Sequence, residues 1–154
     1  MPKYYKLIAD NRRARHDFEI VEVYRAGVVL KGSEVKSVRL GRVNLRESFA
    51  RADGGEIWIH GMHISPYEKS RAEDFNPARP RKLLLNQREL NRLIGYSNQK
   101  GLALVPLKIY FERDWAKIDI AVARAKKRYD KRASIREREE KREISKRLKE
   151  SKKK

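Results

Sequence analysis

The sequence predicts a mainly β fold, an antiparallel barrel of the OB type with short flanking helices and a basic C-terminal tail that is disordered when free. Several segments are rich in β-branched and aromatic residues, which favour strands. The element order is roughly strand, strand, strand, helix, strand, strand, plus extra elements, and a helix between the third and fourth strands is the order of an OB-type barrel. Only three large apolar side chains follow Ala133, too few to offset the ordering entropy of so long a segment. An open α+β sheet is the alternative, because the pattern alone does not separate the two.

The first strands follow a polar start. Residues 1–17 form a basic arm that enters the fold. Residues 18–24 and 28–30 predict two strands, and Ala26-Gly27 permits a turn or bulge between them.

Two helices are predicted from their caps. Ser33 is a suitable cap for a short helix that Gly41 ends, with a strand as the alternative. Asn86 begins the longer helix, and Glu89 lies three residues on, as in a capping box. Further along this helix, one face carries Leu90, Leu93 and Ile94, and the end falls at Gly95 or Gly101.

A hairpin is the best-supported pair of strands. Residues 44–51 and 56–64 flank Asp53-Gly54-Gly55, a turn signal typical of antiparallel strands. Strand alternation in the second arm predicts one face with Ile57, Ile59, Gly61 and His63, and another with Trp58, His60, Met62 and Ile64. The rest of the chain predicts a long surface loop over 65–82 and strands at 102–111 and 118–123.

Composition favours a polyanionic partner. The formal net charge is +18 and the isoelectric point is near 10.3, which makes nucleic acid the leading partner and an anionic membrane surface the second. No run approaches the ~18 apolar residues of a spanning helix. The chain has no cysteine, and its start carries no apolar stretch of the kind found in secretion signals. We therefore expect a cytoplasmic protein that does not bind membranes.

Catalytic and metal-binding signals are weak. His60 and His63 lie three apart, so on a strand they point to opposite faces and cannot easily chelate one ion. No nucleophile with a local base, phosphate-binding loop or dinucleotide motif is discernible. We expect a binding protein without metal or cofactor, the alternative being a nuclease that uses the two histidines and a carboxylate.

Basic clusters give the stronger signal. Three of them precede the tail: Arg12, Arg13, Arg15 and His16; Lys36, Arg39 and Arg42; and Arg79, Arg81 and Lys82. From Arg124 to Lys154 the chain holds 16 Lys and Arg against 6 Asp and Glu. Such an arm gains counterion-release energy on nucleic acid, and Glu–Lys pairs four residues apart bias it towards a helix there. Tyr129 lies between basic residues and is placed to stack on a base, if it is not an ordinary exposed tyrosine.

Four strings in a fixed order resemble the small protein B family of bacterial ribosome rescue. They are Arg13-Ala14-Arg15-His16, Glu34-Val35-Lys36-Ser37, Arg81-Lys82-Leu83-Leu84-Leu85-Asn86 and Asp130-Lys131-Arg132. Together they cover nearly the whole chain and are highly specific, although no single string would be.

The resemblance implies an OB-type barrel over 18–123 that binds the tRNA-like domain of transfer-messenger RNA, between an arm at 1–17 and a tail at 124–154. It implies that the tail becomes helical in the empty mRNA channel of a stalled ribosome, near the small-subunit decoding region. Elongation factor Tu would deliver the complex, and the protein, which we expect to be a monomer, would not be an enzyme. A general OB-type RNA-binding or ribosomal protein is the alternative.

The resemblance also assigns residues. Leu84 and Asn86 are the first candidates for gripping RNA, with Arg13, His16, Glu34 and Lys36 after them. Candidates for ribosome accommodation are Lys126, Lys127, Tyr129, Asp130, Lys131 and Arg132. Arg25 stands where relatives more often have Glu, so an acidic RNA contact is absent or relocated. Ala125 replaces a common Gly, which stiffens the junction of barrel and tail.

Overall fold

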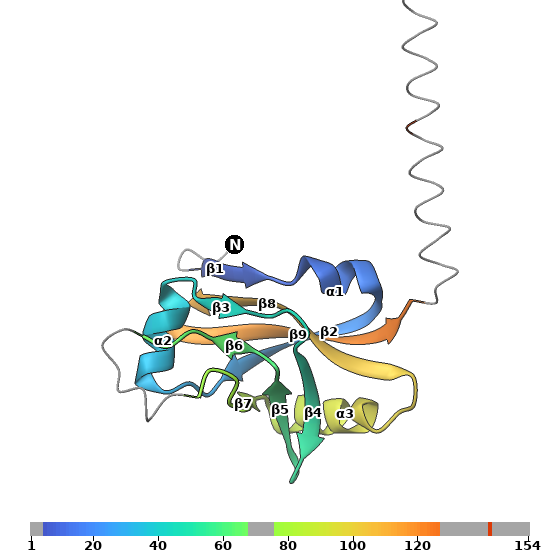
Figure 1. Cartoon of the computed structure of the whole chain (residues 1–154). Coiled ribbons are helices and arrows are strands. Elements are labelled where there is room, and N and C mark those ends of the chain that lie inside the picture. Colours follow the sequence, from blue (N-terminus) through green and yellow to red (C-terminus); the bar gives the residue numbers. More distant parts are fainter. Residues whose placement is uncertain (1–4, 68–75, 127–141, 143–154) are drawn as a thin grey trace, which may run out of the picture.

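The computed structural model describes residues 5–67, 76–126 and 142 (Figure 1). Short helices surround a strongly bent sheet. The helices are α1 (Arg12–Asp17), α2 (Gly32–Arg39) and α3 (Gln87–Ser97). The strands are β1 (Tyr5–Asp10), β2 (Phe18–Val28), β3 (Val43–Asn44), β4 (Phe49–Asp53), β5 (Glu56–His60), β6 (His63–Ile64), β7 (Arg81–Leu84), β8 (Leu102–Glu112) and β9 (Trp115–Ala125).

The main sheet closes on itself. Its strand order is β1-β8-β4-β5-β7-β2-β9, and β9 also pairs with β8, so the strands from β8 to β9 form a ring. Every pairing is antiparallel, and β1 is an additional strand on the outer edge of β8. The barrel predicted from the element order is therefore confirmed, and the open sheet is wrong. Closure leaves fewer free strand edges than an open sheet would.

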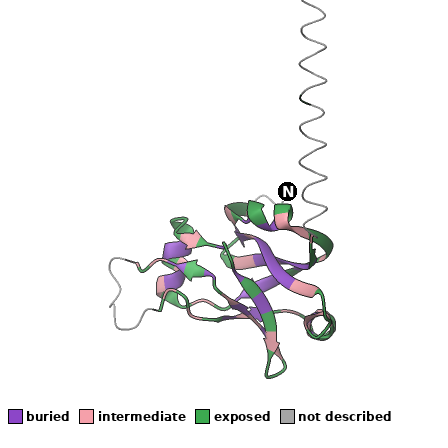
Figure 2. Ribbon diagram, turned by 45° about the vertical axis from the view of Figure 1, so that its right-hand side comes forward, coloured by how far each residue is buried: buried purple, intermediate pink, exposed green. Residues whose placement is uncertain are grey.

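Figure 2 marks in purple the buried residues along the strands of the barrel. Apolar side chains fill the barrel interior. Its fully buried members include Ile57, Ile59, Leu83, Ile109, Ile118 and Ile120. Helix α3 contacts β4, β5 and β8, and its buried residues Leu90 and Leu93 join the same core. Strand β5 alternates as predicted, with Ile57 and Ile59 buried and Trp58 and His60 only partly buried. Strands β8 and β9 instead carry runs of consecutive buried residues, so both of their faces are covered.

The start of the chain is more ordered than a polar arm. Residues 5–10 form β1, whose register with β8 runs from Tyr5 opposite Glu112 to Asp10 opposite Lys108. Helix α1 follows because Asn11 caps it: the Asn11 side chain accepts a hydrogen bond from the Ala14 N–H. The strand escaped prediction because β1 contains no buried residue and so carries no apolar alternation.

Three other predictions need correction. β2 runs unbroken from Phe18 to Val28, so Ala26-Gly27 does not separate two strands, and Val29 lies beyond its end. β7 was not predicted, because its first residue, Arg81, reads as loop in sequence yet is fully buried. Gly61, at φ 76°, ends the alternation of β5, so Met62 and Ile64 are buried like Ile57 and Ile59, while His63 is exposed.

The helices confirm one predicted cap and correct the other. Asn86 caps α3, with its side chain accepting from the Glu89 N–H at 2.9 Å. This helix ends at Ser97, not at either glycine. α2 begins one residue before Ser33, and Glu34 serves its N-terminus by accepting from the Lys31 N–H at 2.9 Å. The hairpin turn is as predicted: Gly54 and Gly55 connect Asp53 to Glu56.

Candidate nucleic-acid interface

A buried ion cluster joins α2 to β7. The Glu34 carboxylate accepts from Arg81 Nε at 2.8 Å and also pairs with Arg79. Arg81 donates further to the carbonyl oxygens of Met62, at 2.6 Å, and Pro77, at 3.1 Å. Glu34 is 2% exposed and Arg81 is 0% exposed. The cluster therefore fixes the segment leading into β7 against α2.

This burial changes the interpretation of two predicted residues. Burial opposes ionisation of Glu34, but the Lys31 N–H and the guanidinium groups of Arg79 and Arg81 outweigh it and lower the pKa of the carboxyl. Glu34 is thus a charged structural residue whose oxygens face protein donors. Arg81 is not part of a surface patch, because its guanidinium group is buried and pairs with the Glu34 carboxylate.

Leu84 and Asn86 lie on the surface at the C-terminal end of β7. Leu84 is the last residue of β7, and its side chain is 53% exposed. It lies opposite Gly27 of β2, where a side chain's Cβ would come within 3.3 Å of the Leu84 Cβ. Asn86 is exposed at the start of α3. An exposed large apolar side chain beside a helix N-terminus is a surface suited to an RNA backbone and its bases.

A second basic region lies on α1. Arg13 and His16 are both exposed and both approach Asp17, at 3.5 and 3.0 Å. Arg15 pairs with Asp10 at 2.6 Å. The Lys126 N–H donates to the Asp17 carbonyl, so α1 adjoins the C-terminal end of β9. In Figure 1, α1 and α2 lie towards opposite ends of the barrel, so the predicted RNA contacts fall into two regions.

The basic residues around α2 rest on aromatic rings. Lys36 Nζ lies 5.5 Å from the centre of the Tyr67 ring. The Arg39 guanidinium lies 4.7 Å from the centre of the Phe111 ring and 3.6 Å from Asp114. Both cations remain exposed and available to phosphate.

Arg25 takes part in a network that the sequence did not reveal. Its Nε donates to the Tyr110 hydroxyl at 2.8 Å, its guanidinium pairs with Glu112, and Tyr110 donates to Asp119 at 2.8 Å. Burial, together with the Asp119 carboxylate, raises the pKa of Tyr110 to about 12. Arg25 therefore braces the outside of the barrel, a role that depends on pairing between distant strands.

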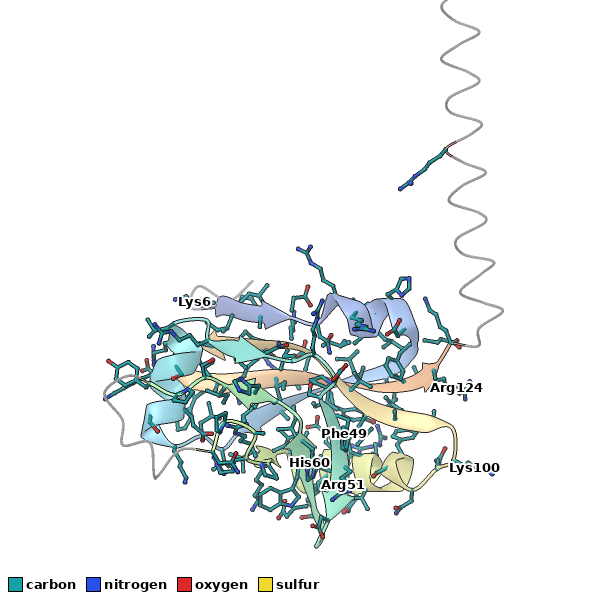
Figure 3. The ribbon with its side chains drawn as sticks, viewed as in Figure 1. Lys6, Phe49, Arg51, His60, Lys100 and Arg124 are labelled. Carbon is teal, nitrogen blue, oxygen red and sulfur yellow. The ribbon has the colours of Figure 1, made fainter. Side chains whose placement is uncertain are left out.

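The histidines do not come together. His60 is half-buried, stacks on Phe49 with ring centres 5.5 Å apart, and has a pKa lowered by burial and by Arg51. Figure 3 shows Phe49, His60 and Arg51 together on the β4–β5 hairpin. His63 is exposed on β6. Within the described residues, no three potential ligands gather into a metal site.

Of the residues predicted to take part in ribosome accommodation, the structure describes Lys126 alone. Lys127, Tyr129, Asp130, Lys131 and Arg132 lie outside the described residues. Among the helices of the described part, none has the length and apolar character needed to cross a membrane.

Comparison with known proteins gives consistent matches over nearly the full length. A family model described as SmpB protein matches residues 8–150. The SsrA-binding protein of Carboxydothermus hydrogenoformans is 56% identical over 143 residues, 93% of this chain and 96% of the relative. That of Geobacillus thermodenitrificans is 51% identical over 148 residues, 96% of each chain. A chain in the solved structure "tmRNA-SmpB: a journey to the center of the bacterial ribosome" is 51% identical, with a TM-score of 0.66, and the match covers 83% of this chain and 94% of that one.

The closed barrel, its exposed basic helices and the net charge of +18 define an OB-type nucleic-acid-binding protein. The family match extends over both regions of predicted RNA contacts and confirms the resemblance drawn from the four strings. The chain belongs to the SmpB protein family.

Proposed function

We propose that this protein binds the tRNA-like domain of transfer-messenger RNA and escorts it to stalled ribosomes, where incomplete proteins are tagged for degradation. The observation that carries the proposal is that the chain is 51–56% identical to SsrA-binding proteins over nearly its full length. Its sheet also closes into the barrel that the order of its elements predicted. The likeness to the tmRNA-SmpB chain supports a ribosomal site of action.

The RNA grip in this proposal centres on Leu84 and Asn86, and Lys36 on α2 is a further contact. Glu34 contributes indirectly by holding Arg79 and the entry to β7 in place. Arg13 and His16 form a separate contact region on α1, close to where the tail begins. Ribosome accommodation depends on six residues at the start of the tail: Lys126, Lys127, Tyr129, Asp130, Lys131 and Arg132. The rest of the tail binds in the mRNA channel when the channel is empty.

The protein acts in the cytoplasm as a monomer, and elongation factor Tu delivers its complex with transfer-messenger RNA. It does not itself catalyse a reaction. A general OB-type RNA-binding protein is the competing function, since the same barrel and charge would serve it.

Affinity measurements at one salt concentration test the choice, because phosphate contacts make any RNA affinity salt-dependent. The full chain should bind the isolated tRNA-like domain much more tightly than an unrelated RNA hairpin. Leu84→Ala should lower the affinity for that domain and leave the thermal midpoint unchanged, since the side chain is half exposed. Leu7→Ala, at a residue 49% exposed on β1, is the matched control. Equal affinity for the two RNAs would establish the general RNA-binding protein instead.

Asn86→Ala separates binding from capping. Loss of the cap costs about 1 kcal/mol of stability. The affinity for the tRNA-like domain, measured on folded protein, should fall beyond what that loss explains. Gln87→Ala, at the next exposed residue, should change neither quantity much. An unchanged affinity in folded Asn86→Ala would make the residue purely structural.

A further inference from the structure

Two adjoining grooves lie between α1 and the β3–β4 region. The first has a volume of about 310 Å³ and is lined by apolar side chains, among them Phe18, Phe49 and Val105, with Arg13 and Glu47 also in its wall. The second has a volume of about 360 Å³ and includes Arg12, Arg13 and Arg46. Asn11 and Arg13 line both grooves, so an apolar hollow and a basic one meet along the same edge of α1.

The apolar groove is built by residues held in place. Asn11 is 6% exposed, and its Nδ2 donates to the carbonyl oxygens of Pro106, at 2.9 Å, and Leu45, at 3.3 Å. Glu47 has a φ of 60°, an uncommon conformation for a residue with a side chain. A Cβ at Gly61 would lie 3.1 Å from the Glu47 carbonyl oxygen, so the absence of a side chain there lets the chain pass close behind. Backbone strain of this kind is often retained at a binding site.

Phe49 is one of the two aromatic side chains that line this groove. It is 43% exposed, although large apolar residues of a barrel usually turn inward. His60 stacks on it with an interplanar angle of 14°, which holds the ring in one orientation. A fixed, exposed aromatic ring is the usual platform for an unstacked RNA base.

The basic groove fits the attached phosphate. Arg15 and Arg13 pair with Asp10 and Asp17, which neutralises these two carboxylates. Within residues 5–67 and 76–126, no carboxylate pairs with Arg12 or Arg46, and both are exposed. Guanidinium groups without a partner are well suited to phosphate oxygens.

We propose that these grooves form a subsite for one unstacked nucleotide of single-stranded RNA, with the base against Phe49 and its phosphate at Arg12 and Arg46. The subsite rests on the proposed function only in that the partner is RNA. It lies on α1 and the β3–β4 region, not on the Leu84 and Asn86 surface. Glu47, the groove's carboxylate without an ion pair among the described residues, accepts a hydrogen bond from the amino group of adenine, cytosine or guanine.

Fluorescence titration of the full chain tests the subsite. The probe is a short single-stranded RNA with one 2-aminopurine, whose emission falls when the base stacks on a ring. The wild-type protein should quench it. Phe49→Leu should remove the quenching and weaken binding by roughly 5- to 150-fold, the effect of losing one stacked base. Phe49→Tyr keeps the ring and should restore both. Trp115→Leu, at a residue 72% exposed at the opposite end of β9, should change neither.

Exposed arginines keep the test decisive if Phe49→Leu does not fold. Arg46→Gln should weaken binding and reduce the salt dependence by about one counterion, with quenching at saturation retained. Lys6→Gln, at the far end of β1 (Figure 3), is the charge control and should have a smaller effect. Absence of quenching by the wild type, or equal losses in Arg46→Gln and Lys6→Gln, would overturn the subsite. Normal tRNA-like-domain binding that still depends on Leu84 would then leave the proposed function standing.

Discussion

At the scale of single residues, the largest energetic demand falls on Glu34 and Arg81. Both are almost fully removed from water, and each provides the charge that makes burial of the other tolerable. The arginine also satisfies the carbonyl oxygens of Met62, just before β6, and Pro77, so the cluster connects α2 and β7 to the two segments that hold these carbonyls. Exposed ion pairs elsewhere on the molecule remain hydrated and screened by salt, so each contributes far less to the free energy of unfolding.

Glu34→Gln should therefore be strongly destabilising. It leaves the Arg81 guanidinium buried without its counter-charge, a change that typically costs about 3–5 kcal/mol. Glu56→Gln is the matched control, since Glu56 lies 3.5 Å from Lys82 with both side chains more than a third exposed, and its loss should cost about 1 kcal/mol or less. Urea unfolding of the two variants gives the comparison. Similar losses in both would show that the buried pair has no special weight.

The same carboxyl should make stability depend on pH. Hydrogen bonds from Lys31, Arg79 and Arg81 prevail over burial and lower the pKa of Glu34 below its ordinary value of 4.5. A lowered folded-state pKa means that the stabilisation is fully present above the unfolded-state pKa and is lost as pH falls through the folded-state pKa. Unfolding free energies measured from pH 7 downward should thus fall less steeply below about pH 4.5 in Glu34→Gln than in the wild type. Parallel profiles would contradict this assignment.

At the scale of elements, the sequence predicted the features that depend on residues close together in the chain, such as helix caps and tight turns. Asn86 predicts the start of α3, and Gly54-Gly55 predicts the hairpin turn, because caps and turns depend on neighbours in sequence. β1 and β7 were missed because their side chains do not alternate in polarity: β1 lies on the surface, and β7 buries an arginine. The ion partner of Arg81 lies 47 residues away, so no pattern within β7 could reveal it.

The candidate site divides in the same way. Resemblance pointed to Leu84, Asn86, Arg13 and Lys36, and the structure leaves all of them exposed. Glu34 could not be assigned to the interior from sequence, because an acidic residue at the start of a helix is ordinarily a surface residue. The grooves around Phe49 have no signature at all, since they form only where α1 meets β4 and β8.

Gly61 ends the alternation of β5, and replacing it tests how much that position depends on having no side chain. Gly61→Ala should destabilise the protein by more than the 1–2 kcal/mol that a side chain costs at positive φ, roughly the penalty of the left-handed conformation. The excess arises because the new Cβ would meet the Glu47 carbonyl oxygen at 3.1 Å and the Ser48 Cα at 3.3 Å. Gly41→Ala is a close control, with the same φ of 76° and nothing within 4 Å. Equal unfolding free energies for the two variants would show that the backbone behind the groove moves aside freely.

At the scale of the whole molecule, folding and charge are separable. Among the described residues, the barrel closes through pairings that end at Ala125, and the buried residues of the main core run in sequence from Tyr24 to Val122. The chain after Lys127 carries 13 of the 39 Lys and Arg residues. Stability should thus depend on the barrel, whereas long-range attraction to RNA should depend on barrel and tail together.

Removal of everything after Lys127 should consequently leave the thermal midpoint close to that of the full chain, because no described barrel pairing is lost. Affinity for the tRNA-like domain should stay mostly intact, because Leu84 and Asn86 are retained. Its salt dependence should be weaker, because the removed segment holds 13 Lys and Arg against 6 Asp and Glu. Tagging in a reconstituted rescue assay should be abolished, since the residues proposed to engage the ribosome are gone. A charge-neutral control replaces the removed segment by a Gly/Ser linker of equal length, which is flexible and uncharged. Tagging that survives either change would place ribosome accommodation in the barrel, whose basic helices α1 and α2 are retained in both variants.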